Sequence, residues 1–172
     1  MKKRQLPGWI IAAVCLLFAV SCSAEPKDRF FELEDKVSTA FFDYRVEDVS
    51  VYQHYNGMDA RQGQQIVVVD LAIKNKENYT LPMGRYDFRI QWGLEGELFA
   101  YPEACQCREQ LPDEYEIPEK DSVEGKLVFQ VPQEQKNLCL AYLEIFENDE
   151  QGDAYFTCFT LGAAPKSGSL QG

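Results

Sequence analysis

Residues 65–73 read Gln-Ile-Val-Val-Val-Asp-Leu-Ala-Ile, and this stretch decides the fold class. Val67, Val69 and Leu71 lie on one face of an extended chain, and Ile73 continues that face, because side chains alternate between the two sides of a strand. The stretch is dominated by β-branched side chains, which pack well on a pleated sheet. It therefore predicts a strand at the centre of a β-sheet.

Similar short runs lie on both sides of this strand. They cover residues 41–52, 86–92, 98–101, 123–131, 138–146 and 154–161. Turn-forming residues separate them, including Asn56-Gly57 and the polar stretch 148–153. In the first run the apolar alternation changes phase near Glu47-Asp48, which is typical of a β-bulge. No internal stretch of ten or more residues has a convincing helical period.

About seven half-buried strands must cover their apolar faces, and a second sheet does this most simply. The sequence therefore predicts an all-β protein with an immunoglobulin-like, two-sheet antiparallel β-sandwich. The Cys-Trp-Cys spacing of antibody domains is missing, so the prediction concerns architecture alone.

The N-terminus has the pattern of an export signal over residues 1–21. A positive head of Lys2, Lys3 and Arg4 precedes an apolar run at 9–20. This run is too short to span a hydrocarbon core of about 30 Å. The pattern therefore indicates a secretory signal peptide rather than a membrane anchor.

The end of this signal, Ala19-Val20-Ser21-Cys22, resembles the lipobox of bacterial lipoproteins. That family usually has Leu three residues before the cysteine, where this chain has Ala19. The resemblance implies cleavage before Cys22 and a diacylglyceryl group on its thiol, which would anchor the protein to the cell membrane, outside the cytoplasm. Cleavage after Ala24, which would release a soluble secreted protein, is the alternative.

The polar segment 22–38 predicts a tether between the anchor and a domain at 39–162. Phe30, Phe31, Leu33 and Val37 have near-helical spacing, so a short amphipathic turn is an alternative within it. Residues 163–172 are rich in Gly, Ala and Ser and predict a disordered tail.

The whole chain is acidic, with 17 Lys and Arg against 28 Asp and Glu and a formal charge of −11. Cleavage before Cys22 would remove three basic residues and no acidic one, which gives −14. A nucleic acid is therefore not expected as a partner, because its phosphates would be repelled. The surface could attract basic partners, or its charge could serve solubility alone.

Residues 65–75 (QIVVVDLAIKN), 87–90 (DFRI) and 123–132 (VEGKLVFQVP) together resemble the DUF4352 family, whose domains are MPT63-related. The resemblance covers roughly residues 41–161 and implies an immunoglobulin-like fold and an exported location. It implies no activity and no catalytic residue. The acidic loop 102–121, which carries two cysteines, is longer than the connection usual in that family.

Four cysteines remain beyond Cys15 and Cys22, and in an exported domain an even number suggests disulfides. They are Cys105, Cys107, Cys139 and Cys158. A bond between Cys105 and Cys107 would close a very small ring. We therefore expect bridges from these two residues to Cys139 and Cys158, without deciding the pairing.

The alternative is that Cys105-Gln106-Cys107 binds a soft metal such as Cu(I) or acts as a redox pair. Met58 and Met83 lie far from it in sequence, so we expect structural disulfides, with no metal site and no cofactor. The single histidine, His54, is expected to be a surface or turn residue. The carboxylates of 113–121 and 147–153 are expected to form a solvated surface rather than a calcium site.

Two functions of different classes follow from the sequence. The first is a non-enzymatic binding or interaction module that presents its loops to a protein or cell-envelope ligand. Its expected contact residues are Tyr101, Tyr115 and Tyr155. The second is a copper or redox accessory lipoprotein that uses Cys105 and Cys107.

Overall fold

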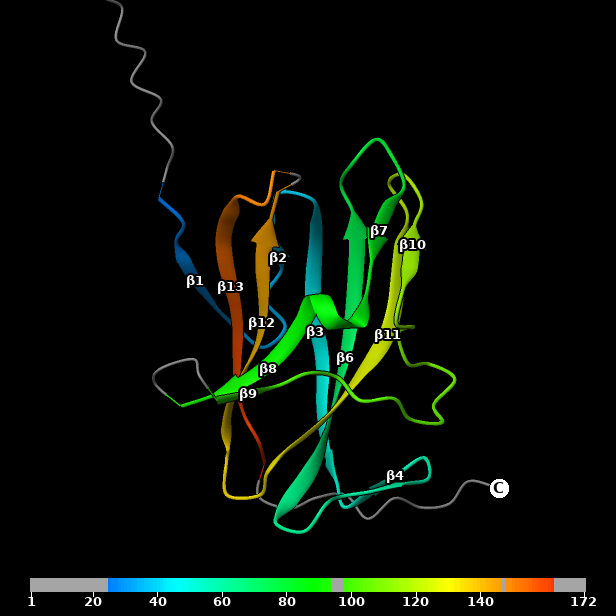
Figure 1. Ribbon diagram of the computed structural model, residues 1–172, viewed down its shortest axis with the longest axis vertical. Helices are drawn as coiled ribbons and strands as arrows, with labels where there is room; N and C mark the ends of the chain where they lie inside the picture. The colour runs from blue at the N-terminus through cyan, green and yellow to red at the C-terminus, as the bar shows by residue number, and fades with distance from the viewer. Residues whose placement is uncertain (1–24, 94–97, 147, 163–172) are drawn as a thin grey trace, which may run out of the picture.

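The computed structural model describes residues 25–93, 98–146 and 148–162, and its ribbon is shown in Figure 1. The predicted signal peptide, Cys22 and the predicted tail lie outside the described residues. The described chain forms a β-sandwich of two main sheets, with one short 3₁₀ turn and no α-helix among the described residues. The prediction of an all-β, two-sheet sandwich is confirmed.

The first main sheet has four strands and is built around the stretch that opened the sequence. In spatial order they are β11 (Ser122–Pro132), β6 (Gln64–Asn75), β3 (Phe42–Tyr52) and β2 (Val37–Ser38). β6 pairs antiparallel with β11 on one side and with β3 on the other. Its predicted central position is therefore confirmed. The register of β3 shifts between Val46 and Asp48, which confirms the predicted bulge.

The second main sheet has five strands. In spatial order they are β1 (Asp28–Glu32), β13 (Gln151–Thr160), β12 (Asn137–Ile145), β8 (Phe88–Trp92) and β9 (Leu98–Ala100). All pairs in it are antiparallel except β1 with β13, which run parallel.

Two small sheets extend the sandwich at its ends. One pairs β7 (Leu81–Met83) with β10 (Tyr115–Ile117), and a 3₁₀ turn, η1 (Arg85–Asp87), leads from β7 into β8. The other is the hairpin of β4 (His54–Tyr55) and β5 (Met58–Asp59). β10 lies within the stretch 102–121 that the sequence predicted as a loop, and β7 lies in the connection between the predicted runs at 65–73 and 86–92. Both strands have only three residues and contain or adjoin a proline, which is rare inside strands, so the sequence did not predict them.

The parallel strand β1 corrects the prediction of a polar tether over 22–38. Phe30 stacks on Phe156 at 5.1 Å between ring centroids, and Phe31 lies 6.4 Å from Tyr155. These rings fix β1 against the edge of β13. Composition concealed the strand, because Asp28 and its charged neighbours flank the two aromatic residues.

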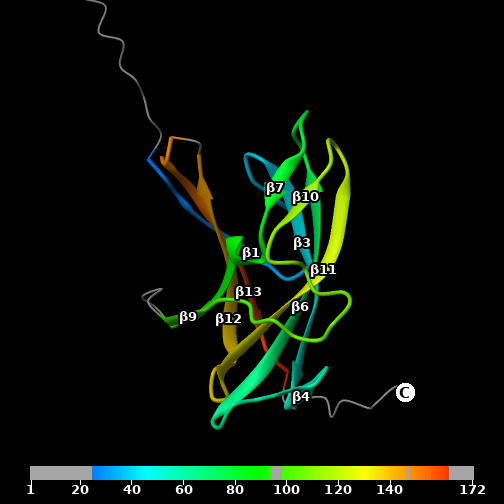
Figure 2. The ribbon, with the colours of Figure 1, turned by 45° about the vertical axis from the view of Figure 1, so that its right-hand side comes forward.

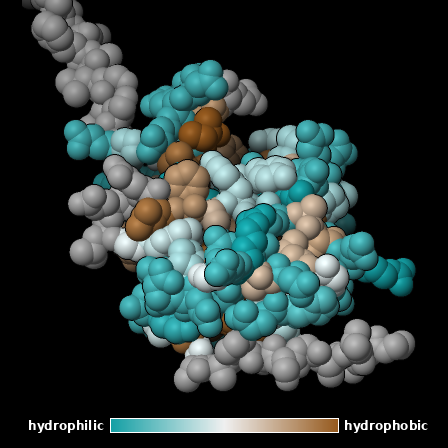
Figure 3. Space-filling view, turned by 60° about the horizontal axis from the view of Figure 1, so that its bottom comes forward, coloured by the Kyte–Doolittle hydropathy of each residue, from teal (hydrophilic) through white to brown (hydrophobic). Residues whose placement is uncertain are grey.

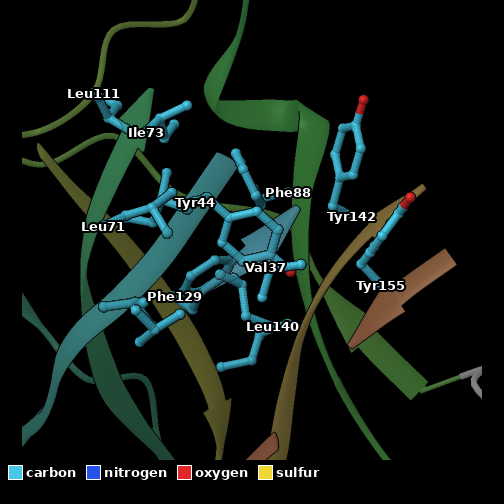
Figure 4. Close-up of a cluster of buried hydrophobic side chains, with 14 of the residues drawn as sticks. Val37, Tyr44, Leu71, Ile73, Phe88, Leu111, Phe129, Leu140, Tyr142 and Tyr155 are labelled. Carbon is cyan, nitrogen blue, oxygen red and sulfur yellow. The ribbon is translucent and has the colours of Figure 1, made fainter. Parts of the chain in front are cut away.

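The core lies between the two main sheets and is rich in aromatic rings (Figure 4). Phe42, Tyr44 and Phe88 are almost completely buried and contact one another. The Thr157 hydroxyl donates to the Tyr44 hydroxyl across the core at 3.3 Å, and burial raises the pKa of Tyr44 to about 12. The sheets diverge toward the upper end of the view in Figure 2, where β12 and β13 lean away from β7 and β10. Seen from the lower end, the surface is mainly hydrophilic, with separate apolar patches (Figure 3).

Asp43 on β3 forms ion pairs with two lysines near the β2 edge of the four-stranded sheet. Its carboxylate lies 2.7 Å from Lys36 and 3.7 Å from Lys76. Burial opposes its ionisation, but hydrogen bonds from Lys36 and Ser38 and the two positive charges hold its pKa below the usual value. The ionised carboxylate therefore stabilises the fold above the unfolded-state pKa of about 3.9, and this stability is lost as pH falls through the lower folded-state pKa.

We therefore expect Asp43→Asn to be less stable than the wild type near neutral pH, and we expect the difference to shrink as the pH falls below the unfolded-state pKa of about 3.9. Urea unfolding of both proteins at a series of pH values measures this. A difference that stays constant with pH would show that Asp43 acts only through its shape and hydrogen bonds.

Candidate binding groove

Residues of both main sheets line an apolar groove at the end of the sandwich where β7 lies, which is the upper end in Figure 1. Its volume is about 740 Å³, which lies in the range of small-molecule and peptide side-chain sites. The start of β3, the strand β7 and the end of β12 supply most of its lining. The lining residues are Phe41, Phe42, Tyr79, Leu81, Pro82, Met83, Asp87, Tyr142, Leu143, Ile145, Phe146 and Asn148.

The floor and the rim of this groove differ in exposure. Phe42 and Tyr142 are buried and pack edge to face at 4.8 Å between centroids, so they form a fixed floor. Three large side chains remain exposed at the rim: Tyr79 at 50%, Ile145 at 48% and Phe146 at 37%. Exposed apolar side chains that surround a hollow are typical of a surface that another molecule covers.

Two polar groups lie among the apolar residues of the groove. One carboxylate oxygen of Asp87 accepts the Gly84 N–H at 2.8 Å. Desolvation raises the pKa of Asp87, and this hydrogen bond partly opposes the shift. Burial, together with the carboxylates of Glu144 and Asp87, raises the pKa of Tyr142. A ligand in the groove would therefore meet a neutral phenol and an aspartate.

A buried carboxylate ties the two sheets together beside the groove. Glu144 on β12 accepts the Ala40 N–H at 2.6 Å, and Ala40 belongs to the connection that leads into β3. It also accepts the Tyr155 hydroxyl and the Asp153 N–H, both at 3.3 Å. These contacts hold the end of β12, and with it Ile145, at a fixed distance from β3.

Two other hollows lie outside this lining or beside it. The larger, of about 1210 Å³, is lined by polar residues of the 134–137 turn and by apolar residues from the ends of β1 and β8, including Phe31 and Trp92. The smaller, of about 590 Å³, adjoins the groove and shares Pro82, Met83 and Asp87 with it. Glu114 and Glu116 line this smaller hollow, so the groove continues into an acidic surface.

The three tyrosines predicted as binding contacts are not brought together. Tyr101 is exposed and packs with Phe99 and Tyr86, outside the groove lining. Tyr115 on β10 is partly buried, and its hydroxyl is buried with no hydrogen-bond partner in the described part of the chain. Tyr155 is buried, which corrects the expectation that it is exposed.

The error for Tyr155 comes from the strand that carries it. β13 lies between β1 and β12, and Tyr155 shares a face of it with Gln151, Asp153 and Thr157. Tyr155 points into the core, where it contacts Tyr142 at 6.1 Å between centroids (Figure 4). Burial and the nearby Glu144 raise its pKa to about 12. The polar residues on this face make it resemble the solvent side of a strand, so the alternating pattern does not identify it as the inner face.

The disulfide prediction needs a second correction. Cys139 on β12 is bonded to Cys158 on β13, and the two lie directly opposite each other in the strand register. Cys105 and Cys107 are unbonded and partly buried, so the loop is not bridged to the last hairpin. The sequence contained the signal: Cys139 lies nine residues before Asn148 and Cys158 nine residues after Asp149, so a turn centred there pairs them.

His54 is exposed on β4, in agreement with its prediction as a surface residue, and its Nδ1 lies 2.6 Å from an Asp59 carboxylate oxygen. Within residues 25–93, 98–146 and 148–162, no cluster of three or more His, Cys, Asp or Glu side chains could hold a metal ion. Over the same described ranges, no helix has the length and apolar character needed to cross a membrane.

Comparison with known proteins decides the family. The family model described as a domain of unknown function (DUF4352) matches residues 31–151. The chain belongs to the DUF4352 family. The resemblance read from the strands is thus confirmed, and the match covers most of the sandwich described above. No curated protein matches the chain.

Solved structures with the same fold come from several bacteria. A candidate lipoprotein, ycdA of Bacillus subtilis, is 21% identical with a TM-score of 0.58; the match covers 74% of this chain and 38% of that one. MPT63, a secreted protein of Mycobacterium tuberculosis, is 11% identical with a TM-score of 0.53, over 78% and 99% of the two chains. A functionally unknown protein of Listeria monocytogenes is 9% identical with a TM-score of 0.54, over 74% and 82%. At these identities the likeness shows the fold alone.

Proposed function

We propose that this member of the DUF4352 family is a non-enzymatic binding module, exported and anchored to the cell membrane through a lipid on Cys22. In this account the groove takes apolar side chains from a basic polypeptide partner of the cell envelope. The single observation that carries the proposal is the apolar groove with Tyr79, Ile145 and Phe146 exposed on its rim.

The location is supported by the N-terminal sequence. The positive head, the short apolar run and Cys22 have the order of a lipoprotein signal. Among the proteins of similar fold, one is a candidate lipoprotein and another is a secreted protein, which agrees with export.

The preference for a basic partner rests on charge. The chain carries a formal charge of −11, and removal of the signal peptide would make it −14. Asp87, Glu114 and Glu116 line the hollow that adjoins the groove. Complementary charge speeds encounter and orients a partner, while the apolar contacts supply most of the affinity.

Peptide binding tests the proposal. We expect a labelled peptide of alternating Leu and Lys to bind the wild type, and a matched Leu and Glu peptide not to bind, as measured by fluorescence anisotropy. Ile145→Asn should weaken binding by at least about tenfold, because a buried aliphatic side chain contributes about 1.5–3 kcal/mol. Leu98→Asn, at a similarly exposed position on β9 outside the groove, is the control. Equal loss in both variants would contradict the groove as the site.

A further inference from the structure

The two cysteines left free by the Cys139–Cys158 bond lie on a loop at some distance from the groove. The loop connects β9 to β10 and lies just above the β4–β5 hairpin in Figures 1 and 2. Beneath both segments is the outer face of the four-stranded sheet, where Ile66, Val68 and Val128 form a small buried cluster. Cys105 packs against this cluster, which is a second apolar patch separate from the groove.

The loop is held in place by its own hydrogen bonds. The Gln110 side chain donates to the Glu103 carbonyl at 2.6 Å and accepts the Cys105 N–H at 2.9 Å. The Gln110 N–H also reaches the Cys107 carbonyl at 3.3 Å. Arg61 binds both carboxylate oxygens of Glu103, at 2.6 and 2.8 Å. The turn that carries the two thiols is thus fixed at both ends.

The β4–β5 hairpin contacts this turn and carries a third sulfur, that of Met58. The Tyr55 hydroxyl lies 3.4 Å from the Cys107 sulfur, and a Cβ at Gly57 would lie 3.7 Å from the Gln106 side-chain oxygen. Met58 and Cys105 pack against the same buried cluster. Met58 precedes Cys105 by 47 residues, so the sequence shows no connection between them. The fold thus brings the Met58 thioether and the Cys105 thiol to one cluster, and Cys107 joins them through its contact with Tyr55 of the same hairpin.

We propose that Cys105, Cys107 and Met58 form a binding site for a single Cu(I) ion. On binding, Cu⁺ forms bonds to the two cysteine sulfurs, each thiol releases its proton, and the Met58 sulfur donates a lone pair without a change of charge. No electron is transferred. Thiolate and thioether ligands together favour Cu(I). Zinc is held instead by thiolates, imidazoles and carboxylates, and Met58 supplies none of these.

The charge of the occupied site has a compensating group nearby. Two thiolates and one Cu(I) carry a net charge of −1, and the Arg85 guanidinium acts on Cys105 in the direction that favours a thiolate. Because each thiol must lose its proton to bind the ion, binding should release protons and become tighter as the pH rises.

Competition for Cu(I) tests the site. The full-length protein, purified from membranes without oxygen, is titrated with Cu(I) in the presence of bicinchoninate. We expect one Cu(I) per chain in the wild type and none in Cys105→Ser/Cys107→Ser. Met58→Leu should bind Cu(I) at least about tenfold more weakly, since even the loss of a residue that only contacts a metal ligand lowers metal affinity by about this factor. Met83→Leu is the matched control, because Met83 lies in the groove.

Three results would overturn the site. The first is a Cys105–Cys107 disulfide in the protein as isolated without oxygen, detected by alkylation and mass spectrometry. The second is a wild type that takes no Cu(I) from bicinchoninate. The third is an equal affinity in Met58→Leu and the wild type, since that variant keeps both thiols and does not depend on how the double serine variant folds.

Discussion

Asn75→Asp is expected to destabilise the fold by about 4 kcal/mol at neutral pH, the range observed when a charge is buried without a partner. Asn75 is completely buried at the end of β6. Its side-chain amide donates to the carbonyls of Tyr79, Ile117 and Pro118 at 2.8, 3.0 and 3.1 Å. Its oxygen accepts the Glu77 N–H at 2.7 Å. Aspartate has the same shape but cannot donate when it is ionised, so three carbonyls would face a negative charge.

The effect should depend on pH with a definite sign. The buried carboxylate introduced by Asn75→Asp should have a raised pKa, because burial disfavours its charged form. The variant should therefore be closest to the wild type in stability below the unfolded-state pKa of about 3.9, and should lose relative stability as the pH rises.

Urea unfolding at several pH values measures both effects. Asn56→Asp is the control, because Asn56 is exposed in the β4–β5 turn, and it should change stability by less than about 0.5 kcal/mol. An Asn75→Asp protein within about 1 kcal/mol of the wild type at neutral pH would show that water or a shift of the chain replaces the lost bonds.

Cys22→Ser is expected to abolish membrane attachment. The anchor proposed here is a set of acyl chains on Cys22, and each buried CH₂ group contributes about 0.8 kcal/mol. Without the thiol no acyl chain can be attached, and an acidic protein has no charge attraction to an anionic membrane surface. The wild type should therefore be almost fully membrane-bound, whereas Cys22→Ser should carry no lipid anchor.

Cell fractionation and metabolic labelling with palmitate measure this change. Cys15→Ser is a matched control, since Cys15 lies within the predicted signal peptide and should be removed with it. A Cys22→Ser protein that remains labelled and membrane-bound would contradict the lipid anchor. A wild-type N-terminus at Glu25 would instead support the alternative cleavage after Ala24.

The long strands could be predicted from the sequence because each combines an apolar alternation with turn residues at its ends. β6 and β11 follow this pattern over most of their length, and the bulge in β3 was visible as a change of phase. β1 was missed because its pairing is parallel and distant in sequence, so no neighbouring turn announces it. Short strands such as β7 give too few residues for a period to be read.

The groove could not be predicted, because it depends on how far the sheets diverge. Ile145 and Phe146 follow residues 138–143, which are also consecutive apolar residues, so the sequence contained no local signal of their exposure. Tyr155 was mistaken for a surface residue because it shares a face of β13 with Gln151, Asp153 and Thr157. Likewise, Met58 and Cys105 pack against one buried cluster, although the hairpin and the loop that carry them share no sequence pattern.

The two proposed sites lie on different parts of the molecule and can fail separately. The groove depends on Ile145 and Phe146 at one end of the sandwich, whereas the copper site depends on Cys105, Cys107 and Met58 on the outer face of the other sheet. Loss of copper binding would leave the binding module intact, and the reverse also holds.

Photo-crosslinking in intact cells tests the central claim most directly. The crosslinker p-benzoylphenylalanine is introduced at Phe146 on the groove rim or at Phe99 on β9, two phenylalanines with similar exposure of 37% and 40%. The account predicts a discrete polypeptide adduct from position 146 that is lost with Ile145→Asn, and no such adduct from position 99. The same adducts from both positions, or none from position 146, would contradict a partner held in the groove.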